Sequence, residues 1–239
     1  MAQAIKSREY VKLPVNVKGI YDWLYNKKDV YDFFDNQLWV NCITLGFHKK
    51  LVDSVAKELK PGQRVLQFGG TFGLQIEEAA YEIGDSGELT LIDNNKKQLK
   101  RCEKKYDYLF TNIKYKLADV TEFQTDKKYD CVICYNLLHE LPPLSKVQTV
   151  SNTLKALKPG GKAVFVDYHN PVKWHPLRYF MRMFNRLYQP FAEKIWERSI
   201  DTYAQNVDVT DYTWTKSIYG LGMYQKVTAT KRGNFESQS

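Results

Sequence analysis

Residues 64–73 read RVLQFGGTFG, an apolar strand-like run that passes directly into a glycine-rich turn. The glycines Gly69, Gly70 and Gly73 permit positive backbone angles and let a ligand approach the main chain closely. A helix is expected to begin at Leu74, and the free N–H groups of its first turn favour an anionic or carboxylate group. Strand, glycine turn and helix in this order predict a nucleotide-type binding loop at residues 67–73.

The chain after this loop alternates between strand and helix patterns. Strands are expected at 88–92, 113–117, 131–135 and 162–166, and helices at 74–82, 96–108 and 144–157, with a KPGG turn at 158–161. Alternation at this spacing predicts an α/β fold with a mostly parallel sheet and helices on both faces. The segment DYTWTKSIYGLGMYQKVTATK alternates around YGLG, which predicts an antiparallel hairpin at the sheet edge.

The length of 239 residues suits one compact domain with additions. We expect an N-terminal helical segment over 1–60 that packs on or caps the core, an α/β core over 61–170, a basic aromatic helical insertion over 171–205 and a C-terminal hairpin over 206–232. The net charge of +8 suggests an anionic partner, although no nucleic-acid module is recognisable. Four scattered cysteines agree with a reducing compartment.

Polar residues follow five of the expected strands, and ligands bind outside the carboxyl ends of parallel strands. These polar clusters are Gln67–Gly73, Asp93, Asp119, Asn136–Glu140 and Asp167–His169. Asp93 is placed to accept the ribose hydroxyls of an adenosine moiety, and Asp119 to contact the adenine. The alternative is a tight turn with two capping aspartates.

Three of the four histidines fall near the last two strand ends or just beyond them. His139 and His169 are candidates for proton transfer or metal binding, and Tyr168 for a hydrogen bond to a substrate carbonyl. The alternatives are a capping role for His139 and a backbone bond for His169. His48, in GFHKK, is expected at the surface.

The loop and the two acids, followed by YNLLHELP (135–142) and LKPGGK (157–162), resemble class I S-adenosylmethionine-dependent methyltransferases over about residues 64–167. The resemblance implies a Rossmann-like fold with a seven-stranded sheet. It also implies S-adenosylmethionine as cofactor, held by Gln67, Gly69, Gly70, Thr71, Gly73, Asp93, Asp119 and Asn136. In that superfamily the loop usually reads acid-x-Gly-x-Gly-x-Gly, whereas here the acid is Gln67 and the middle glycine is Thr71.

A narrower resemblance joins LQ in the loop, LLHELP (137–142), VDYHNPVKWHPLR (166–178) and GLGMYQKV (220–227). This combination resembles the rhodoquinone-biosynthesis proteins, which have the methyltransferase fold. The resemblance implies amination of ubiquinone to rhodoquinone, with S-adenosylmethionine as the amino donor and manganese (Mn2+) as a further cofactor. Tyr168, His169 and His139 are then the catalytic candidates, and His139 and His169 the candidate metal ligands.

Gln67 agrees with such chemistry. A carboxylate beside an ammonium stabilises the protonated amine, so an amide there favours the neutral amine that attacks an electrophilic quinone ring. A divalent metal on the quinone oxygen would act as a Lewis acid. Two alternatives stay open: a conventional methyltransferase acting on a quinone or lipophilic phenol, and a non-catalytic subunit of the same fold.

The insertion carries Arg178, Arg182 and Arg186 at four-residue spacing, along one helical face. The opposite face is expected to hold Leu177, Phe180, Met181, Phe184, Leu187 and Tyr188. A basic aromatic helix of this kind can lie in a membrane interface, where a ubiquinone resides. We therefore expect peripheral contact at the cytoplasmic side of the inner membrane, or the matrix side in a mitochondrion. The alternative is a lid helix with solvated arginines, and the oligomeric state is left open.

Overall fold

The computed structural model describes residues 44, 46–71, 73–175 and 177–233. The helical segment expected over 1–60 therefore lies mostly outside the described residues, and its described helix is α4, His48–Ala56. The side chains of residues 180, 184 and 188 also lie outside the description.

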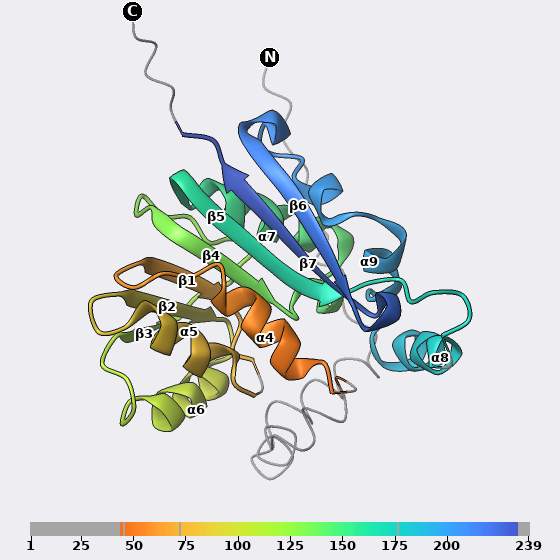
Figure 1. The fold of residues 1–239 in the computed structure, drawn as a ribbon, viewed down its shortest axis with the longest axis horizontal. Coiled ribbons are helices and arrows are strands. Elements are labelled where there is room, and N and C mark those ends of the chain that lie inside the picture. The colour runs from red at the N-terminus through yellow and green to blue at the C-terminus, as the bar shows by residue number, and fades with distance from the viewer. Residues whose placement is uncertain (1–43, 45, 72, 176, 234–239) are drawn as a thin grey trace, which may run out of the picture.

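One seven-stranded sheet forms the centre of the protein, in the order β3-β2-β1-β4-β5-β7-β6 (Figure 1). Strands β1 to β5 run parallel, and β7 lies antiparallel between β5 and β6. This arrangement confirms the expected parallel core with a C-terminal hairpin. The strands are β1 Arg64–Phe68, β2 Glu88–Asp93, β3 Ile113–Leu117, β4 Tyr129–Tyr135, β5 Leu157–Tyr168, β6 Tyr212–Tyr219 and β7 Tyr224–Lys231.

Helices cover both faces of the sheet, with α4, α5 and α6 on one side and α7 behind (Figure 1). Strand β1 is central, and its side chains alternate between the two cores. Val65 packs with α4 to α6, whereas Leu66 and Phe68 pack with α7. The remaining helices are α5 Gln75–Ile83, α6 Lys96–Tyr106, α7 Pro143–Lys155, α8 Arg178–Tyr188 and α9 Glu193–Glu197, with 3-10 turns η1 Leu138–Glu140, η2 Ile200–Tyr203, η3 Val209–Asp211 and η4 Gly220–Gly222.

The KPGG segment differs from the expected turn, because β5 runs through it from Leu157. The pairing with β4 shifts here, since Tyr129 pairs with Leu157 and Cys131 already pairs with Lys162. Gly160 has a φ of 75°, so the extra residues bulge out of the ladder while the strand continues. Glycines that resemble a turn in the sequence therefore form an irregularity inside one strand.

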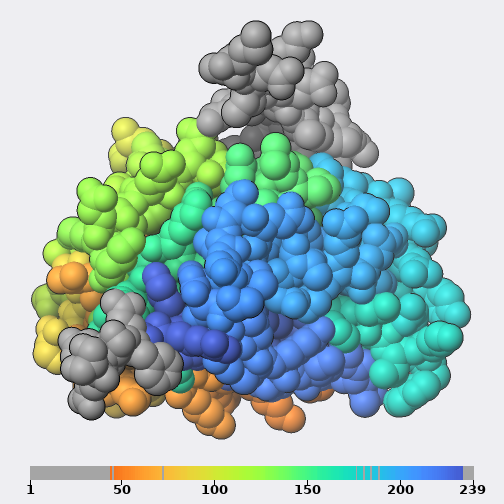
Figure 2. All heavy atoms as spheres, turned by 90° about the horizontal axis from the view of Figure 1, so that it is seen from above, coloured from red at the N-terminus to blue at the C-terminus, as the bar shows by residue number. Residues whose placement is uncertain are grey.

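The insertion lies beside the carboxyl ends of the parallel strands, near the turn between β6 and β7 (Figure 1). In the space-filling view the cyan and light-blue segment that contains α8 and α9 forms one end of the molecule (Figure 2). Within the described residues, no helix is both long enough and apolar enough to cross a bilayer. The strand order reverses between β1 and β4, and this is where a ligand crevice is expected.

Candidate functional site

The glycine loop has the backbone conformation that its sequence predicts. Gly69 and Gly73 have φ angles of 85° and 84°, in the left-handed region that favours glycine. Gly70 needs its glycine for a different reason, because a Cβ there would lie 2.8 Å from Gln98 Cγ. Gln98 Nε2 also donates a hydrogen bond of 3.1 Å to the Gly70 carbonyl. The loop is therefore held against helix α6.

Asp93 fastens this loop to the end of β2. Its Oδ2 accepts a hydrogen bond of 2.7 Å from the Gly70 N–H, and its Oδ1 accepts one of 2.7 Å from the Asn95 N–H. Burial raises the pKa of the Asp93 carboxyl, and these two backbone hydrogen bonds oppose that shift. A carboxylate has about four lone-pair sites, so both oxygens can still accept ribose hydroxyls.

Asp119 lies at the surface after β3, and its Oδ1 accepts hydrogen bonds from the Thr121 N–H at 2.8 Å and the Thr121 hydroxyl at 2.7 Å. These bonds agree with the alternative interpretation, in which Asp119 is a capping aspartate of a turn. Its contact with an adenine stays a prediction.

Several polar atoms around the ends of β1 and β4 are buried and have no hydrogen-bond partner within the described part of the chain, and three of them belong to predicted cofactor-binding residues. These three are Gln67 Oε1, Thr71 Oγ1 and Asn136 Oδ1. Gln67 is 0% exposed, and its Nε2 donates only a long bond of 3.5 Å to the Gly69 carbonyl. Asn136 has a φ of 49°, a conformation that asparagine tolerates better than most residues. Buried polar atoms normally have partners, so this set fits the polar amino-acid end of S-adenosylmethionine.

Two buried residues, His139 and Asp167, and the partly buried Tyr168 form a cluster where η1 meets the end of β5, called here the His139 cluster. His139 Nδ1 is 2.9 Å from Asp167 Oδ1, and the His139 N–H donates to Asp167 Oδ2 at 3.2 Å. The same Asp167 Oδ1 accepts the Tyr168 N–H at 2.7 Å. The His139 and Tyr168 rings stack with centroids 4.3 Å apart and an interplanar angle of 29°.

The charges in this cluster give its members different proton affinities. Burial alone would lower the pKa of His139, but the charge and hydrogen bond of Asp167 outweigh it and hold that pKa above its ordinary value. Burial raises the pKa of Tyr168, and the charges of Asp167 and Glu140 add to this shift. The cluster therefore places a basic imidazole against a phenol that stays protonated at neutral pH.

His169 bonds to the backbone, in agreement with the alternative interpretation. Its Nδ1 is 3.1 Å from the Gly222 carbonyl, and its N–H donates to the Met223 carbonyl at 2.8 Å. Burial and then the charge of Lys216 lower the pKa of His169. Within the described ranges no three His, Cys, Asp or Glu side chains are grouped to hold a metal ion. The described residues therefore give no support to a manganese site, and His139 and His169 as its ligands stay a prediction.

His48 is buried, so its expected surface position is wrong. It is 1% exposed, and its Nε2 accepts a hydrogen bond of 3.2 Å from the Leu74 N–H, where α5 begins after the glycine loop. A signal for this was present in the sequence. His48 precedes Leu51, Val52 and Val55 at the spacing of one helical face, and all three are core residues.

Lys146 is a second residue that sequence reasoning missed. It lies fully buried in α7, and its Nζ donates to the Leu141 carbonyl at 2.6 Å and to the Phe191 carbonyl at 2.9 Å. Burial lowers the pKa of Lys146 to about 8. The lysine thereby joins the segment after η1 to the insertion. No periodicity in the sequence distinguishes it from a solvated helix lysine.

Comparison with known proteins places these features in context. Residues 65–161 match a family model described as a methyltransferase domain. The chain is 27% identical over 135 residues to the ubiquinone/menaquinone biosynthesis C-methyltransferase UbiE of Proteus mirabilis, covering 54% of this chain and 53% of that protein. It is 27% identical to the uncharacterized methyltransferase sll0829 of Synechocystis sp., covering 77% of this chain and 82% of that protein.

The chain spans about half the length of the first of these curated relatives, with shares of 53% and 44% for the UbiE proteins of Proteus mirabilis and Vibrio cholerae. Among solved structures, the N-methyltransferase NodS from Bradyrhizobium japonicum in complex with S-adenosyl-L-homocysteine superposes with a TM-score of 0.57 at 15% identity. That match covers 90% of this chain and 98% of NodS, and it confirms the expected Rossmann-like fold.

Proposed function

We propose that this protein is an S-adenosylmethionine-dependent transferase acting on a quinone related to ubiquinone. Two findings support this proposal: residues 65–161 match a methyltransferase-domain model, and the fold resembles that of NodS. The observation that carries the proposal is the His139–Asp167 pair beside the glycine loop. Leu137, two residues before His139, lies against the glycine loop, since a Cβ built on Gly69 would be 3.7 Å from Leu137 Cδ1. The quinone substrate is suggested by the names of the UbiE relatives.

Different residues would hold the two ends of the cofactor. Gln67, Thr71 and Asn136 would hold the amino-acid end, because their buried oxygens have no partner in the described chain. Asp93 would receive the ribose hydroxyls at the end of β2. When bound, S-adenosylmethionine supplies a methyl group on a sulfonium.

The His139 cluster supplies the acid–base chemistry. Neutral His139 accepts the proton that a ring carbon or hydroxyl of the substrate loses on methylation, and Asp167 stabilises the resulting imidazolium. Tyr168 keeps its proton and donates a hydrogen bond to a ring oxygen. A general base of this kind contributes about 10² to 10⁴ in rate. C-methylation is the reaction that the UbiE names specify.

A second candidate function is the amination of ubiquinone to rhodoquinone, and Gln67 favours it. This amide is 0% exposed at the position where the superfamily usually has an acid. A neutral side chain there leaves a bound amine without a carboxylate partner, so the amine loses its proton more readily and becomes nucleophilic. The product would carry an amino group in place of a ring methoxy group.

One incubation separates the two candidates. The purified protein is mixed with ubiquinone, or with its demethylated precursor, and with S-adenosylmethionine labelled either in the methyl group or in the amino nitrogen. Mass spectrometry of the extracted quinone then shows which label is transferred. Methyl label supports the first candidate, and nitrogen label with loss of methoxy supports the second. Neither label in any quinone would refute both and leave a non-catalytic subunit.

A further inference from the structure

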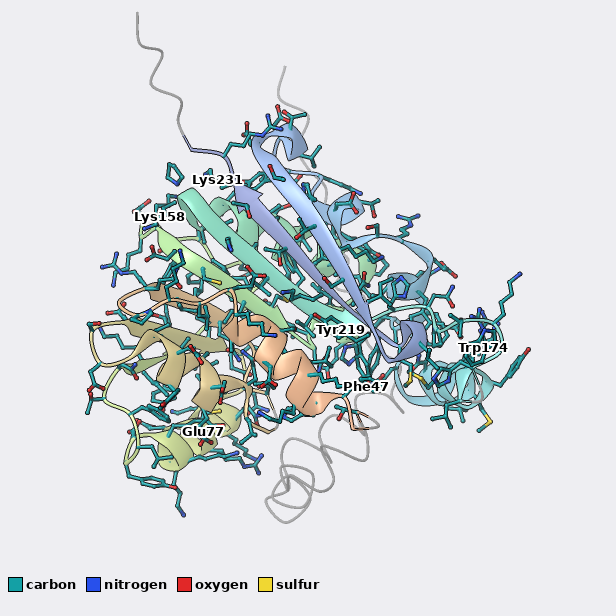
Figure 3. All side chains as sticks on the ribbon, in the orientation of Figure 1. Phe47, Glu77, Lys158, Trp174, Tyr219 and Lys231 are labelled. Carbon is teal, nitrogen blue, oxygen red and sulfur yellow. The ribbon has the colours of Figure 1, made fainter. Side chains whose placement is uncertain are left out.

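Helix α8 presents an apolar stripe to solvent. Tyr179, Met183 and Leu187 follow one another at four-residue intervals and are 72%, 55% and 53% exposed. Trp174, shortly before the helix, is 71% exposed and lies at the edge of the molecule, away from the sheet (Figure 3). We call these four residues the outer face of α8. Large apolar side chains gathered on one exposed face mark an interaction surface.

The other side of the helix is fixed to the protein. Arg182 Nε and Arg186 Nε lie 3.6 Å and 3.3 Å from Glu193 Oε1 in α9. Arg178 donates a hydrogen bond to the Pro171 carbonyl, and Met181 packs against the core cluster on the sheet. The orientation of the stripe is therefore set by contacts of α8 with its neighbours.

This orientation revises the faces expected from the sequence. Leu187 does point outward, but Met181 points into the protein, and Arg182 and Arg186 turn toward Glu193. The side chains of Phe180, Phe184 and Tyr188 lie outside the described residues. The spacing of the arginines did not predict the exposed stripe of Tyr179, Met183 and Leu187.

The charges around the outer face are mostly positive. Residues 171–198 contain six Lys and Arg residues and two Glu residues. Lys173 is exposed next to Trp174, and the Arg186 side chain is 67% exposed next to Leu187. A second copy of this chain, with its own net charge of +8, would bring like charges together on such a surface. An anionic lipid surface instead matches both the apolar stripe and the cations beside it.

We propose that the outer face of α8 docks this protein onto the surface of an anionic phospholipid bilayer, with the four side chains in the headgroup boundary and Lys173 and Arg186 against lipid phosphates. Gln189 follows α8 directly, and its side chain meets the Tyr168 phenol. Docking by this face therefore holds the His139 cluster close to the membrane. Insofar as the proposed quinone function is correct, the same contact presents the site to a substrate dissolved in the bilayer.

The test is co-sedimentation of the full-length protein with vesicles, in the absence of quinone and S-adenosylmethionine. We expect binding to vesicles of mixed phosphatidylglycerol and phosphatidylcholine, and weak binding to phosphatidylcholine alone. The double variant Met183→Ser/Leu187→Ser should lower the partition coefficient by at least about tenfold. Leu144→Ser is the matched control, because Leu144 is 65% exposed on α7, outside this face, and should bind like the wild type.

Several results would overturn the proposal. Unchanged binding of the double variant, or equal binding to neutral and anionic vesicles, would do so. So would a dimer that the double variant dissociates while vesicle binding is unchanged, since a second copy would then cover the face. Circular dichroism checks that both variants fold. Because no substrate is present, failure of the quinone reaction leaves this test unaffected, and a soluble short-chain quinone tests that reaction without a membrane.

Discussion

Replacing Asp167 by Asn tests the His139 cluster most directly. The carboxylate accepts three hydrogen bonds, from His139 Nδ1, the His139 N–H and the Tyr168 N–H. If the asparagine oxygen accepts the bonds from His139 Nδ1 and the Tyr168 N–H, the NH2 group of the asparagine faces the His139 N–H. One buried backbone donor then loses its acceptor, which costs about 1–3 kcal/mol of unfolding free energy. We expect a folded but less stable protein.

The same change should lower the pKa of His139. Burial is the largest influence on that pKa and lowers it, whereas Asp167 and, more weakly, Glu140 raise it, so loss of the Asp167 charge should lower the pKa of His139. In the wild type a raised folded-state pKa contributes stability that is complete below about pH 6.5 and is lost as the pH rises through the raised value. The stability difference between wild type and Asp167→Asn should therefore be larger in acid than in alkali.

Three measurements check this reasoning. NMR titration of the His139 ring gives its pKa in both proteins, and urea unfolding at about pH 5.5 and about pH 8.5 gives the two stability differences. Initial rates of the proposed transfer should fall by about 10² to 10⁴. The control is Asp208→Asn, at an exposed residue whose Oδ1 accepts hydrogen bonds from the Thr210 N–H and the Thr210 hydroxyl. An unchanged pKa of His139, or a stability difference equal at both pH values, would refute the electrostatic account.

Three further changes test other parts of the site. Gly70→Ala places a Cβ 2.8 Å from Gln98 Cγ and should weaken S-adenosylmethionine binding at least about tenfold by calorimetry, whereas Gly233→Ala, with open space around it, should not. Gln67→Glu buries a carboxylate, so the melting temperature should drop and recover when S-adenosylmethionine is added; nitrogen transfer, if it occurs, should be lost. Lys146 has a folded-state pKa of about 8, so the unfolding free energy should rise by up to about 3 kcal/mol between about pH 8 and about pH 10.4. Lys146→Met should abolish that rise. An equal rise in the variant would contradict this prediction.

Local pattern in the sequence determined the strands, the glycine loop and the polar residues at the strand ends. A strand end is set by a few neighbouring residues, and parallel strands bring all their carboxyl ends to one edge. The amino-acid sequence alone therefore places Asp93, Asn136 and Asp167 at that edge. Gly69 and Gly73 indicated positive φ angles for the same local reason, and both angles are observed.

Tertiary structure alone decided which partner each of these side chains has. His139 and His169 are alike in sequence context, yet the first pairs with a buried carboxylate and the second with a backbone carbonyl. Those partners come from strands and turns far along the chain, so the local periodicity of the sequence does not predict them. The outward side of α8 was likewise set by Glu193 and by packing on the core. Composition determined that the helix is basic and aromatic, but contacts with neighbouring elements determined which residues face the solvent.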